Sequence, residues 1–251
     1  MRAAGFSDVG RVRTTNEDTF VVDPTLRLFA VADGMGGHGA GEVASGLAIE
    51  ALTGFVSRSS SDTDFSWPYG LDGTLSFDGN RLKTAIHLAN RRVFRAAESN
   101  DDYSGMGTTL VGLLVNGSHV IVGHVGDSRL YLLRGGAIEQ KTEDDSWVAT
   151  ILARDPAAKG VDLSKHPMRN VLTSAIGARD QVEVHIAEIP VTAGDTLLLC
   201  SDGLHGSLGP QALQSILDEE PDVQAAAQRL VIAALDAGSR DNVTALVVRI
   251  D

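Results

Sequence analysis

The sequence predicts an α+β protein built from layers of strands and helices. Segments with strand character and segments with helical periodicity occur in blocks along the 251 residues, which is typical of layered α+β folds. The middle strands are separated by turns, NGS at Asn116 and RGG at Arg134, and this predicts an antiparallel meander. A chain of this length could form one large domain or two small ones. The order of strand and helix segments, which shows no internal repeat, favours a single domain over residues 1–251.

The individual elements follow from the period of the apolar residues. Strands are predicted at Arg27–Ala32, Thr108–Val115, His119–Val125, Arg129–Leu133, Val182–Ile189, Thr196–Cys200 and Val243–Ile250. Helices are predicted at Gly41–Val56, Arg81–Glu98, Ser146–Ala153, Pro210–Leu217 and Asp222–Asp236. Between the first two helices, Ser57–Asn80 is rich in Ser, Asp and Gly, and we interpret it as a long surface loop.

Charge and cysteine content narrow the classes of function. The chain has 21 Lys and Arg against 33 Asp and Glu, and its formal net charge of −12 disfavours nonspecific binding to nucleic acid or to anionic membranes. Its one cysteine, Cys200, excludes an internal disulfide framework, and the start MRAAGFSDVG has no apolar signal core. No apolar run approaches the roughly 20 residues that span a bilayer. We therefore expect a soluble cytoplasmic protein, and a membrane tail in a longer native chain stays open.

Four short acidic motifs are spread over almost the whole chain: NED around Glu17, VADG at Asp33 and Gly34, CSDG at Asp202, and RDN at Asp241. Asp33 and Asp202 follow apolar runs and Asp241 precedes one, so we expect these three carboxylates at strand ends. Carboxylates gathered from distant segments indicate a site for hard cations. The alternative for each of them is that of an ordinary turn or cap residue.

Together the motifs resemble the metal-dependent protein Ser/Thr phosphatases of the PP2C class, particularly the compact bacterial members. The segments that carry the resemblance occur in the family's order over essentially the full chain: RVRTTNED, VADGMGGHGAGEVAS, ANRRVF, GMGTTL, HVGDSRLYLLRGG, HPMRNVLTSAIG, LLLCSDGL and RDNVTALVV. The resemblance implies a four-layer α-β-β-α sandwich, two antiparallel sheets flanked by helices, with metals at one edge. It also implies hydrolysis of phosphoserine and phosphothreonine in proteins by direct attack of a metal-activated water.

The resemblance assigns roles to the acidic residues. Asp33, Asp202 and Asp241 match the ligands of two divalent cations, to which the carbonyl of Gly34 contributes, and Glu17 matches the acid that reaches one ion through water. An oxygen-only set of ligands favours Mn²⁺ or Mg²⁺ over Zn²⁺. Asp127, in HVGDSR, matches the residue that holds a third, weaker cation together with Asp202, although Asp-Ser between two strands also makes an ordinary turn.

Two further residues are candidates for handling the phosphate. Arg13 lies four residues before Glu17, where the family has its phosphate-binding arginine, and Arg11 is the solvated alternative. Eukaryotic relatives place a histidine directly after the DG pair as a proposed general acid, whereas this chain has Met35. His38 is the nearest candidate for that role, and the alternatives are a water on the metals or no general acid.

The glycine-rich segment GMGGHG after Asp33 also fits the spacing G-x-G-x-x-G of dinucleotide-binding loops. An acidic residue directly before the loop would face the pyrophosphate, and the following helix runs into a polar segment instead of a second strand. We therefore interpret the glycines as allowing the chain to pass close to the metal ligands.

Residues Asp144–Asn170 match the mobile flap beside the active site of the family. Asp145 stands where a histidine usually precedes the first serine of the flap, and His166, Arg169 and Asn170 keep the HPxRN pattern, which we interpret as an anchor. The expected partners are phosphorylated proteins and a cognate bacterial Ser/Thr kinase. The enzyme is expected to be a monomer that reverses the phosphorylation by this kinase. Two alternatives stay open: a phosphatase devoted to a single regulatory protein, and a non-catalytic regulator that binds phosphoproteins.

Overall fold

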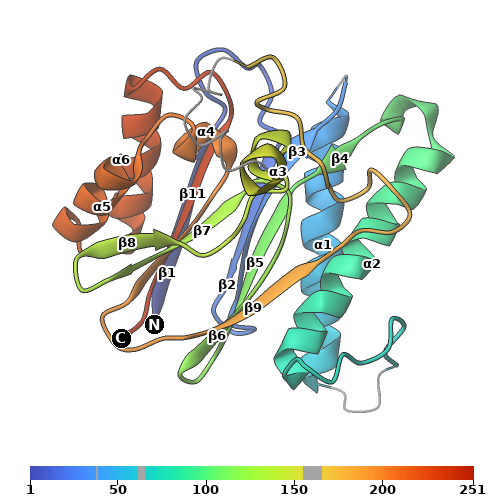
Figure 1. The fold of residues 1–251 in the computed structure, drawn as a ribbon, viewed down its shortest axis with the longest axis horizontal. Coiled ribbons are helices and arrows are strands. Elements are labelled where there is room, and N and C mark those ends of the chain that lie inside the picture. The colour runs from blue at the N-terminus through green and yellow to red at the C-terminus, as the bar shows by residue number, and fades with distance from the viewer. Residues whose placement is uncertain (38, 62–65, 155–165) are drawn as a thin grey trace.

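Two antiparallel sheets form the centre of the protein in a computed structural model that describes residues 1–37, 39–61, 66–154 and 166–251 (Figure 1). The five-stranded sheet has the order β1 (Arg2–Asp8), β11 (Val243–Arg249), β10 (Thr196–Cys200), β7 (Arg129–Arg134) and β8 (Ala137–Gln140). The six-stranded sheet has the order β2 (Asp18–Asp23), β3 (Leu28–Met35), β5 (Leu110–Asn116), β6 (His119–Val125) and β9 (His185–Pro190), with β4 (Gly107–Thr108) also paired to β3.

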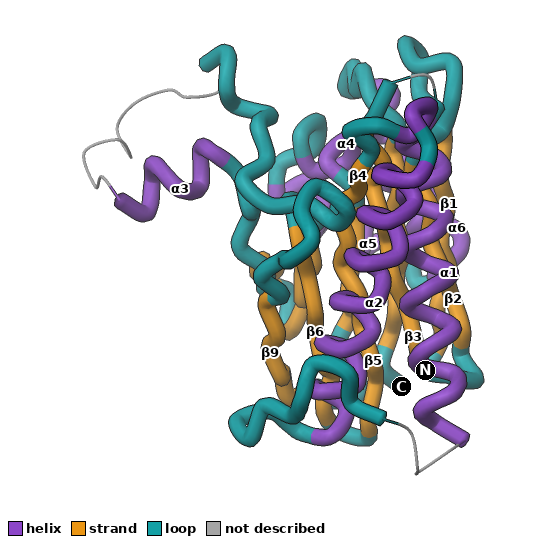
Figure 2. The backbone as a smooth tube through the Cα atoms, turned by 90° about the vertical axis from the view of Figure 1, so that its right-hand side faces the viewer, coloured by secondary structure: helices purple, strands orange, loops and turns teal. Residues whose placement is uncertain are grey.

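Helices cover the outer face of each sheet. The six-stranded sheet packs against α1 (Ala40–Ser61) and α2 (Phe77–Ser99), and the five-stranded sheet packs against α4 (Asp202–His205), α5 (Pro210–Glu219) and α6 (Val223–Asp236). One further helix, α3 (Trp147–Arg154), projects from the body of the molecule (Figure 2). The predicted α-β-β-α order of layers is confirmed. Among the described residues, no helix combines the length and the apolar character needed to cross a bilayer.

The apolar sequence LFAVA of strand β3 does not alternate with polar residues because both faces of the strand are buried. Leu28, Ala30 and Ala32 pack under the helices α1 and α2, whereas Phe29 and Val31 point between the two sheets. Because side chains alternate across a strand, a strand covered on both faces needs apolar residues at every position. The central layer between the sheets is closed from the other side by residues of β7, β10 and β11.

The predicted loop Ser57–Asn80 is wrong at both ends. Helix α1 continues to Ser61, and α2 begins at Phe77, where the Ser76 hydroxyl accepts a hydrogen bond of 3.0 Å from the backbone N–H of Gly79. The polar residues at these helix ends contact each other, since Arg81 donates to the Ser59 hydroxyl (3.1 Å) and to the Val56 carbonyl (2.9 Å). These contacts join residues of two different helices, so the local sequence pattern could not predict them.

Three strands were not anticipated from the sequence, and β1 is the most instructive. Its residues include Ala, Gly and Ser, which have low strand propensity, and it pairs along its full length with β11, from Arg2 opposite Arg249 to Asp8 opposite Val243. Tertiary pairing therefore overrides local preference there. The other two are β2, which pairs with β3, and the short β8. Strand β9 begins at His185, three residues later than predicted.

Candidate active site

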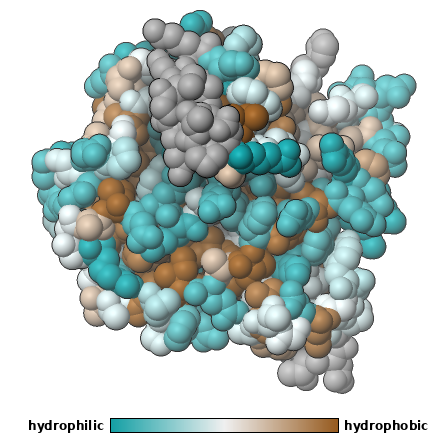
Figure 3. All heavy atoms as spheres, in the orientation of Figure 1, coloured by the Kyte–Doolittle hydropathy of each residue, from teal (hydrophilic) through white to brown (hydrophobic). Residues whose placement is uncertain are grey.

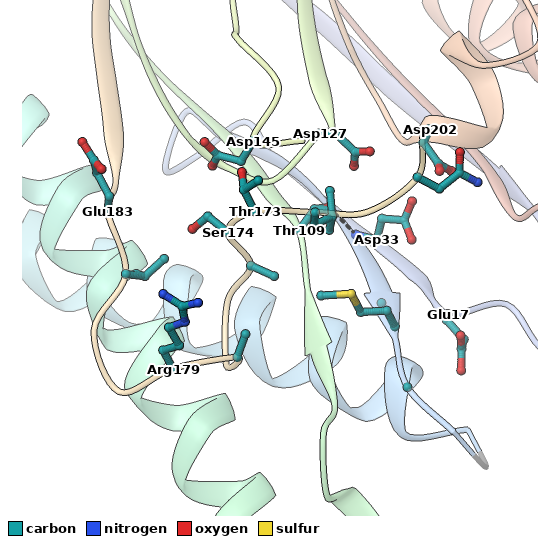
Figure 4. Close-up of a pocket in the computed structure, with 18 of the residues that line it drawn as sticks. Glu17, Asp33, Thr109, Asp127, Asp145, Thr173, Ser174, Arg179, Glu183 and Asp202 are labelled. Carbon is teal, nitrogen blue, oxygen red and sulfur yellow. Dashed lines mark hydrogen bonds between the residues drawn. The ribbon is translucent and has the colours of Figure 1, made fainter. Parts of the chain in front are cut away.

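A cleft of about 770 Å³ opens where the ends of β3 and β10 and the start of β11 meet (Figure 4). Its lining includes Arg13 and all of the predicted metal ligands: Glu17, Asp33, Gly34, Asp127, Asp202 and Asp241. Asp33 belongs to the six-stranded sheet, whereas Asp202 begins α4, two residues after β10 of the other sheet, and Asp241 precedes β11 of that sheet. Residues from both sheets thus converge on one cleft, as the motifs predicted.

Burial and mutual repulsion disfavour negative charge on these acids. Loss of solvent, followed by the charge of Asp18, raises the pKa of Asp33 well above its ordinary value. Burial is also the main cause that raises the pKa of Asp202 to about 6, with the charge of Asp241 second, and that of Asp127 to about 7, with the charge of Asp202 second. Clustered carboxyl groups in such a place require protons or cations between them.

The donor set fits hard divalent cations in type and charge, because every candidate ligand is an oxygen. Asp18, beside this cleft, also has a buried Oδ1 atom without a hydrogen-bond partner among the described residues. The side chains of these acids are nevertheless not close enough together to coordinate an ion as they stand. Among the described residues, no three His, Cys, Asp or Glu side chains form a group that compact. Asp241 is paired with Arg13, whose Nη2 lies 2.7 Å from its Oδ2.

Arg13 is the arginine that reaches the acids. Its guanidinium is half exposed and lines the cleft, whereas Arg11 forms an ion pair of 2.5 Å with Asp236 at the end of α6. The choice of Arg13 over Arg11 for contact with a substrate therefore agrees with the geometry.

Asp33 is fastened by two threonines that the sequence analysis left without a role. The backbone N–H of Asp33 donates to the Thr109 hydroxyl (3.0 Å), the N–H of Thr109 donates to the Asp33 carbonyl (2.8 Å), and the Thr108 hydroxyl donates to the same carbonyl (2.9 Å). Figure 4 shows Thr109 beside Asp33. The Thr109 hydroxyl also lies 2.7 Å from that of Ser128, so it links Asp33 to the turn that carries Asp127.

The glycine-rich segment brings α1 against Glu17. A Cβ atom on Gly34 would collide with the carbonyl of Gly41, and one on Gly41 would lie 2.7 Å from the Glu17 carboxyl carbon. Close approach of the chain therefore requires glycine at both positions. Strand β3 is antiparallel to both β2 and β5, so the segment is not part of the parallel βαβ unit of a dinucleotide fold.

Asn242 connects the Arg13 segment to the strand that follows Asp241, and the sequence analysis missed it. Its side-chain oxygen accepts from the Glu17 N–H (2.8 Å), and its amide donates to the carbonyls of Val9 (2.8 Å) and Thr15 (3.0 Å). Asn242 is the third residue of the RDN motif, and its place beside Asp241 was the sequence signal that could have identified it.

Asp18 is a second residue that the sequence analysis missed, although it is the last letter of NED. It lies opposite Asp33 in the pairing of β2 with β3, and its Oδ2 accepts from the hydroxyls of Ser201 (2.7 Å) and Thr244 (2.6 Å) in the other sheet. Burial raises the pKa of Asp18 to about 7. This carboxyl group thus joins the two sheets directly behind the acids of the cleft.

The turn that carries Asp127 is held from two sides. The carbonyl of Asp127 can only accept, so the ring of His205 donates to it from Nε2 (3.0 Å). On the other side, the N–H of Gly126 donates to Asp145 Oδ2 and the N–H of Asp145 donates to the Gly126 carbonyl, both at 2.9 Å. Asp145 is in turn 3.1 Å from Nε2 of His185 in β9.

The comparison with known proteins identifies the family. A family model described as "Protein phosphatase 2C" matches residues 11–237. The chain belongs to the protein phosphatase 2C family.

Bacterial members of the protein phosphatase 2C family are similar to this chain over its whole length. The serine/threonine phosphatase stp of Listeria monocytogenes is 35% identical over 258 residues, covering 100% of this chain and 96% of that protein. The crystal structure of the Mycobacterium tuberculosis serine/threonine phosphatase PstP/Ppp has a TM-score of 0.84 at 37% identity, covering 100% of this chain and 98% of that one. A second structure, of the PstP catalytic domain with two manganese ions, has a TM-score of 0.81 at 37% identity, with the same coverage.

The segment expected to be the flap of this protein phosphatase 2C domain is described at its two ends. The ring of His166 stacks on that of Trp147, with centroids 4.4 Å apart, and the Trp147 N–H donates to the Val171 carbonyl (2.8 Å). These contacts agree with an anchoring role for the HPxRN pattern. Its Asn170 lines the active-site cleft, and Arg169 and Asn170 both line a neighbouring cleft. The middle of the flap, 155–165, and the candidate general acid His38 lie outside the described residues.

Proposed function

We propose that this cleft hydrolyses phosphoserine and phosphothreonine in protein substrates by direct attack of water. As a member of its family the chain is a metal-dependent protein Ser/Thr phosphatase. The observation that supports the chemistry most strongly is the convergence of Asp33, Asp202 and Asp241 from two sheets on a cleft that also contains Arg13. The retention of all these acids also favours turnover over a purely binding role.

The acids are proposed to hold two divalent cations, Mn²⁺ or Mg²⁺. Asp33, Asp202 and Asp241 would be the direct ligands, together with the carbonyl of Gly34, and Glu17 would act through water. When bound, such ions lower the pKa of water and neutralise the charge of a phosphoryl group. The two manganese ions of the PstP catalytic domain support a pair of cations. We propose a third, weaker site between Asp127 and Asp202, in keeping with the charge of Asp202, which is the second cause that raises the pKa of Asp127 after burial.

Arg13 is proposed to bind the phosphate. Its guanidinium is 51% exposed and needs only to release Asp241 to offer two N–H donors to two phosphate oxygens. Loss of this clamp should weaken ground-state and transition-state binding together. His38 is proposed as the proton donor to the serine or threonine oxygen of the leaving group.

A covalent phosphoenzyme on cysteine is disfavoured by the position of Cys200. This side chain is fully buried in β10, and burial raises the pKa of its thiol to about 12. A thiolate at neutral pH, which a nucleophilic cysteine requires, is therefore strongly disfavoured there. This favours direct attack of water over a cysteine-based route.

We further propose that the enzyme is a single domain that works as a cytoplasmic monomer in signal transduction, on proteins phosphorylated by a Ser/Thr kinase. The acidic composition and the single cysteine support this setting. The activity is tested with purified protein on p-nitrophenyl phosphate and on a phosphothreonine peptide, with Mn²⁺ or Mg²⁺ and with EDTA. Hydrolysis of both substrates that depends on the added cation is expected, and full activity in EDTA would refute the proposal.

A further inference from the structure

The active-site cleft extends well beyond the acids. From Asp33 it continues along the segment before β9 and includes Arg179, Gln181 and Glu183. In Figure 4, Arg179 lies on this segment across the cleft from Glu17, and Glu183 is turned away from Arg179. A phosphorylated side chain occupies only the part of the cleft beside the acids. The wall that carries Arg179 belongs to the same cleft and is open to residues that flank the phosphorylated residue in a protein substrate.

The backbone of this wall is rigidly held. Thr108 and Ile176 exchange both of their backbone hydrogen bonds, at 3.0 and 2.8 Å. The buried side chain of Asn90 in α2 accepts from the N–H of Gly177 (2.8 Å) and donates to the carbonyls of Arg179 and Asp180, both at 3.0 Å. Arg179 is thus presented from a fixed position, which lowers the entropic cost of binding through it.

Arg179 has no acidic partner in its own cleft. Two arginines that lie closer to the acids are paired, Arg13 with Asp241 and Arg129 with Asp144. The exposed side chain of Arg179 makes no ion pair or side-chain hydrogen bond with the residues that the structure describes, although Glu183 lines the same cleft. In a chain with a formal net charge of −12, an unpaired guanidinium carried by a fixed backbone beside the active site is a specific place for an anion.

We propose that Arg179 is a specificity-determining residue that binds an anionic side chain, a carboxylate or a second phosphate, next to the phosphorylated residue of the substrate. This rests on the proposed function to the extent that the cleft must bind a phosphorylated peptide. The preferred substrates are then acidic or multiply phosphorylated segments. A guanidinium binds both anions through paired N–H donors, so the experiment has to separate them.

The test uses phosphothreonine peptides that differ only in the flanking residues: acidic, isosteric amide, lysine, or a second phosphoserine, placed on either side. For the wild type, acidic or doubly phosphorylated peptides should have a KM about fivefold lower than the amide peptide, the size expected for one ion pair at a partly exposed site. Arg179→Ala should abolish that difference with kcat little changed, and Arg179→Glu should favour the lysine peptide. Comparison of the acidic with the doubly phosphorylated peptides shows whether a carboxylate or a phosphate is bound more tightly, and the flank that responds shows on which side of the phosphothreonine it lies.

The matched control is Arg91→Ala, which removes an exposed arginine of α2 that lines none of the described clefts and should keep the preference. Hydrolysis of p-nitrophenyl phosphate should be the same in all variants. A preference that survives in Arg179→Ala, or no preference in the wild type, overturns the proposal for Arg179 alone. Absence of cation-dependent hydrolysis of p-nitrophenyl phosphate by the wild type would instead refute the proposed function.

Discussion

Asn242 offers the sharpest test of how the active site is assembled, because one buried side chain positions both Glu17 and Arg13. We predict that Asn242→Ala lowers stability and activity together. The substitution removes three hydrogen bonds, to the Glu17 N–H and to the carbonyls of Val9 and Thr15. A typical hydrogen bond contributes about 0.5–1.5 kcal/mol. Water can reach part of the freed segment, so we expect a loss of about 2 kcal/mol in the free energy of unfolding.

For a chain of this size, 1 kcal/mol corresponds to a shift of about 2–4 °C in Tm, so calorimetry should find a decrease of about 4–8 °C. The released segment should no longer present Arg13 and Glu17 to the cleft. Residues that orient ligands typically change metal affinity or activity about 10- to 100-fold, and we expect a loss of that size in kcat/KM for a phosphopeptide. Asn242→Asp should be similarly impaired, since a carboxylate accepts from Glu17 but cannot donate to the two carbonyls.

The control is Asn116→Ala. Asn116 is the last residue of β5, and its exposed amide donates a hydrogen bond of 2.6 Å to Asp78 of α2. The substitution should change stability by no more than about 0.5 kcal/mol and leave activity intact. A wild-type Tm for Asn242→Ala would contradict the anchoring role. So would a lowered Tm with unchanged kcat/KM and Mn²⁺ dependence at a temperature where the variant is fully folded.

Three further predictions concern the metals, the Asp127 turn and pH. Asp33→Asn, Asp202→Asn and Asp241→Asn should each lower kcat on p-nitrophenyl phosphate by at least about 100-fold, with an unchanged circular dichroism spectrum; near-wild-type rates would remove that residue from the metal site. His205→Ala should raise the Mn²⁺ concentration needed for half-maximal rate several-fold. His205→Gln keeps an N–H donor and should bring that concentration back close to the wild-type value. Equal behaviour of the two variants would contradict positioning through the Asp127 carbonyl. Burial lowers the pKa of His124, so the unfolded chain binds the proton first and stability should decrease as pH falls below about 6.5. Denaturation curves of His124→Gln should show a weaker decrease, and an identical pH profile would refute this cause.

The sequence predicts the parts of the fold whose signal is local. A strand buried on both faces, such as β3, is uniformly apolar, and the capped helix α6 has clear helical periodicity. Strand β1 was missed because it forms through pairing with β11 at the other end of the chain, from Arg2 opposite Arg249 to Asp8 opposite Val243, which its Ala, Gly and Ser do not indicate.

The same limit applies to the site. The acids carry recognisable motifs, but Asn242 and Thr109 are neutral residues whose roles depend on hydrogen bonds to residues as far as 225 and 76 positions away in the sequence. No local pattern distinguishes such an anchor from an ordinary core residue. Pairing partners and hydrogen-bond partners at long range are therefore what the structure adds to the motifs.

The acids of the cleft are divided between the two sheets, and Asp18 of one sheet is hydrogen-bonded to Ser201 and Thr244 of the other. Cations held jointly by Asp33 and Asp202 would therefore fasten the sandwich at this edge, where like charges otherwise push the sheets apart. Thermodynamic linkage then makes the fold itself a reporter of metal supply, since a cation at 100 times its Kd adds about 2.7 kcal/mol to stability. Scarcity of the metal would reduce both catalysis and resistance to proteolysis, so the abundance of the enzyme would follow the availability of its cofactor.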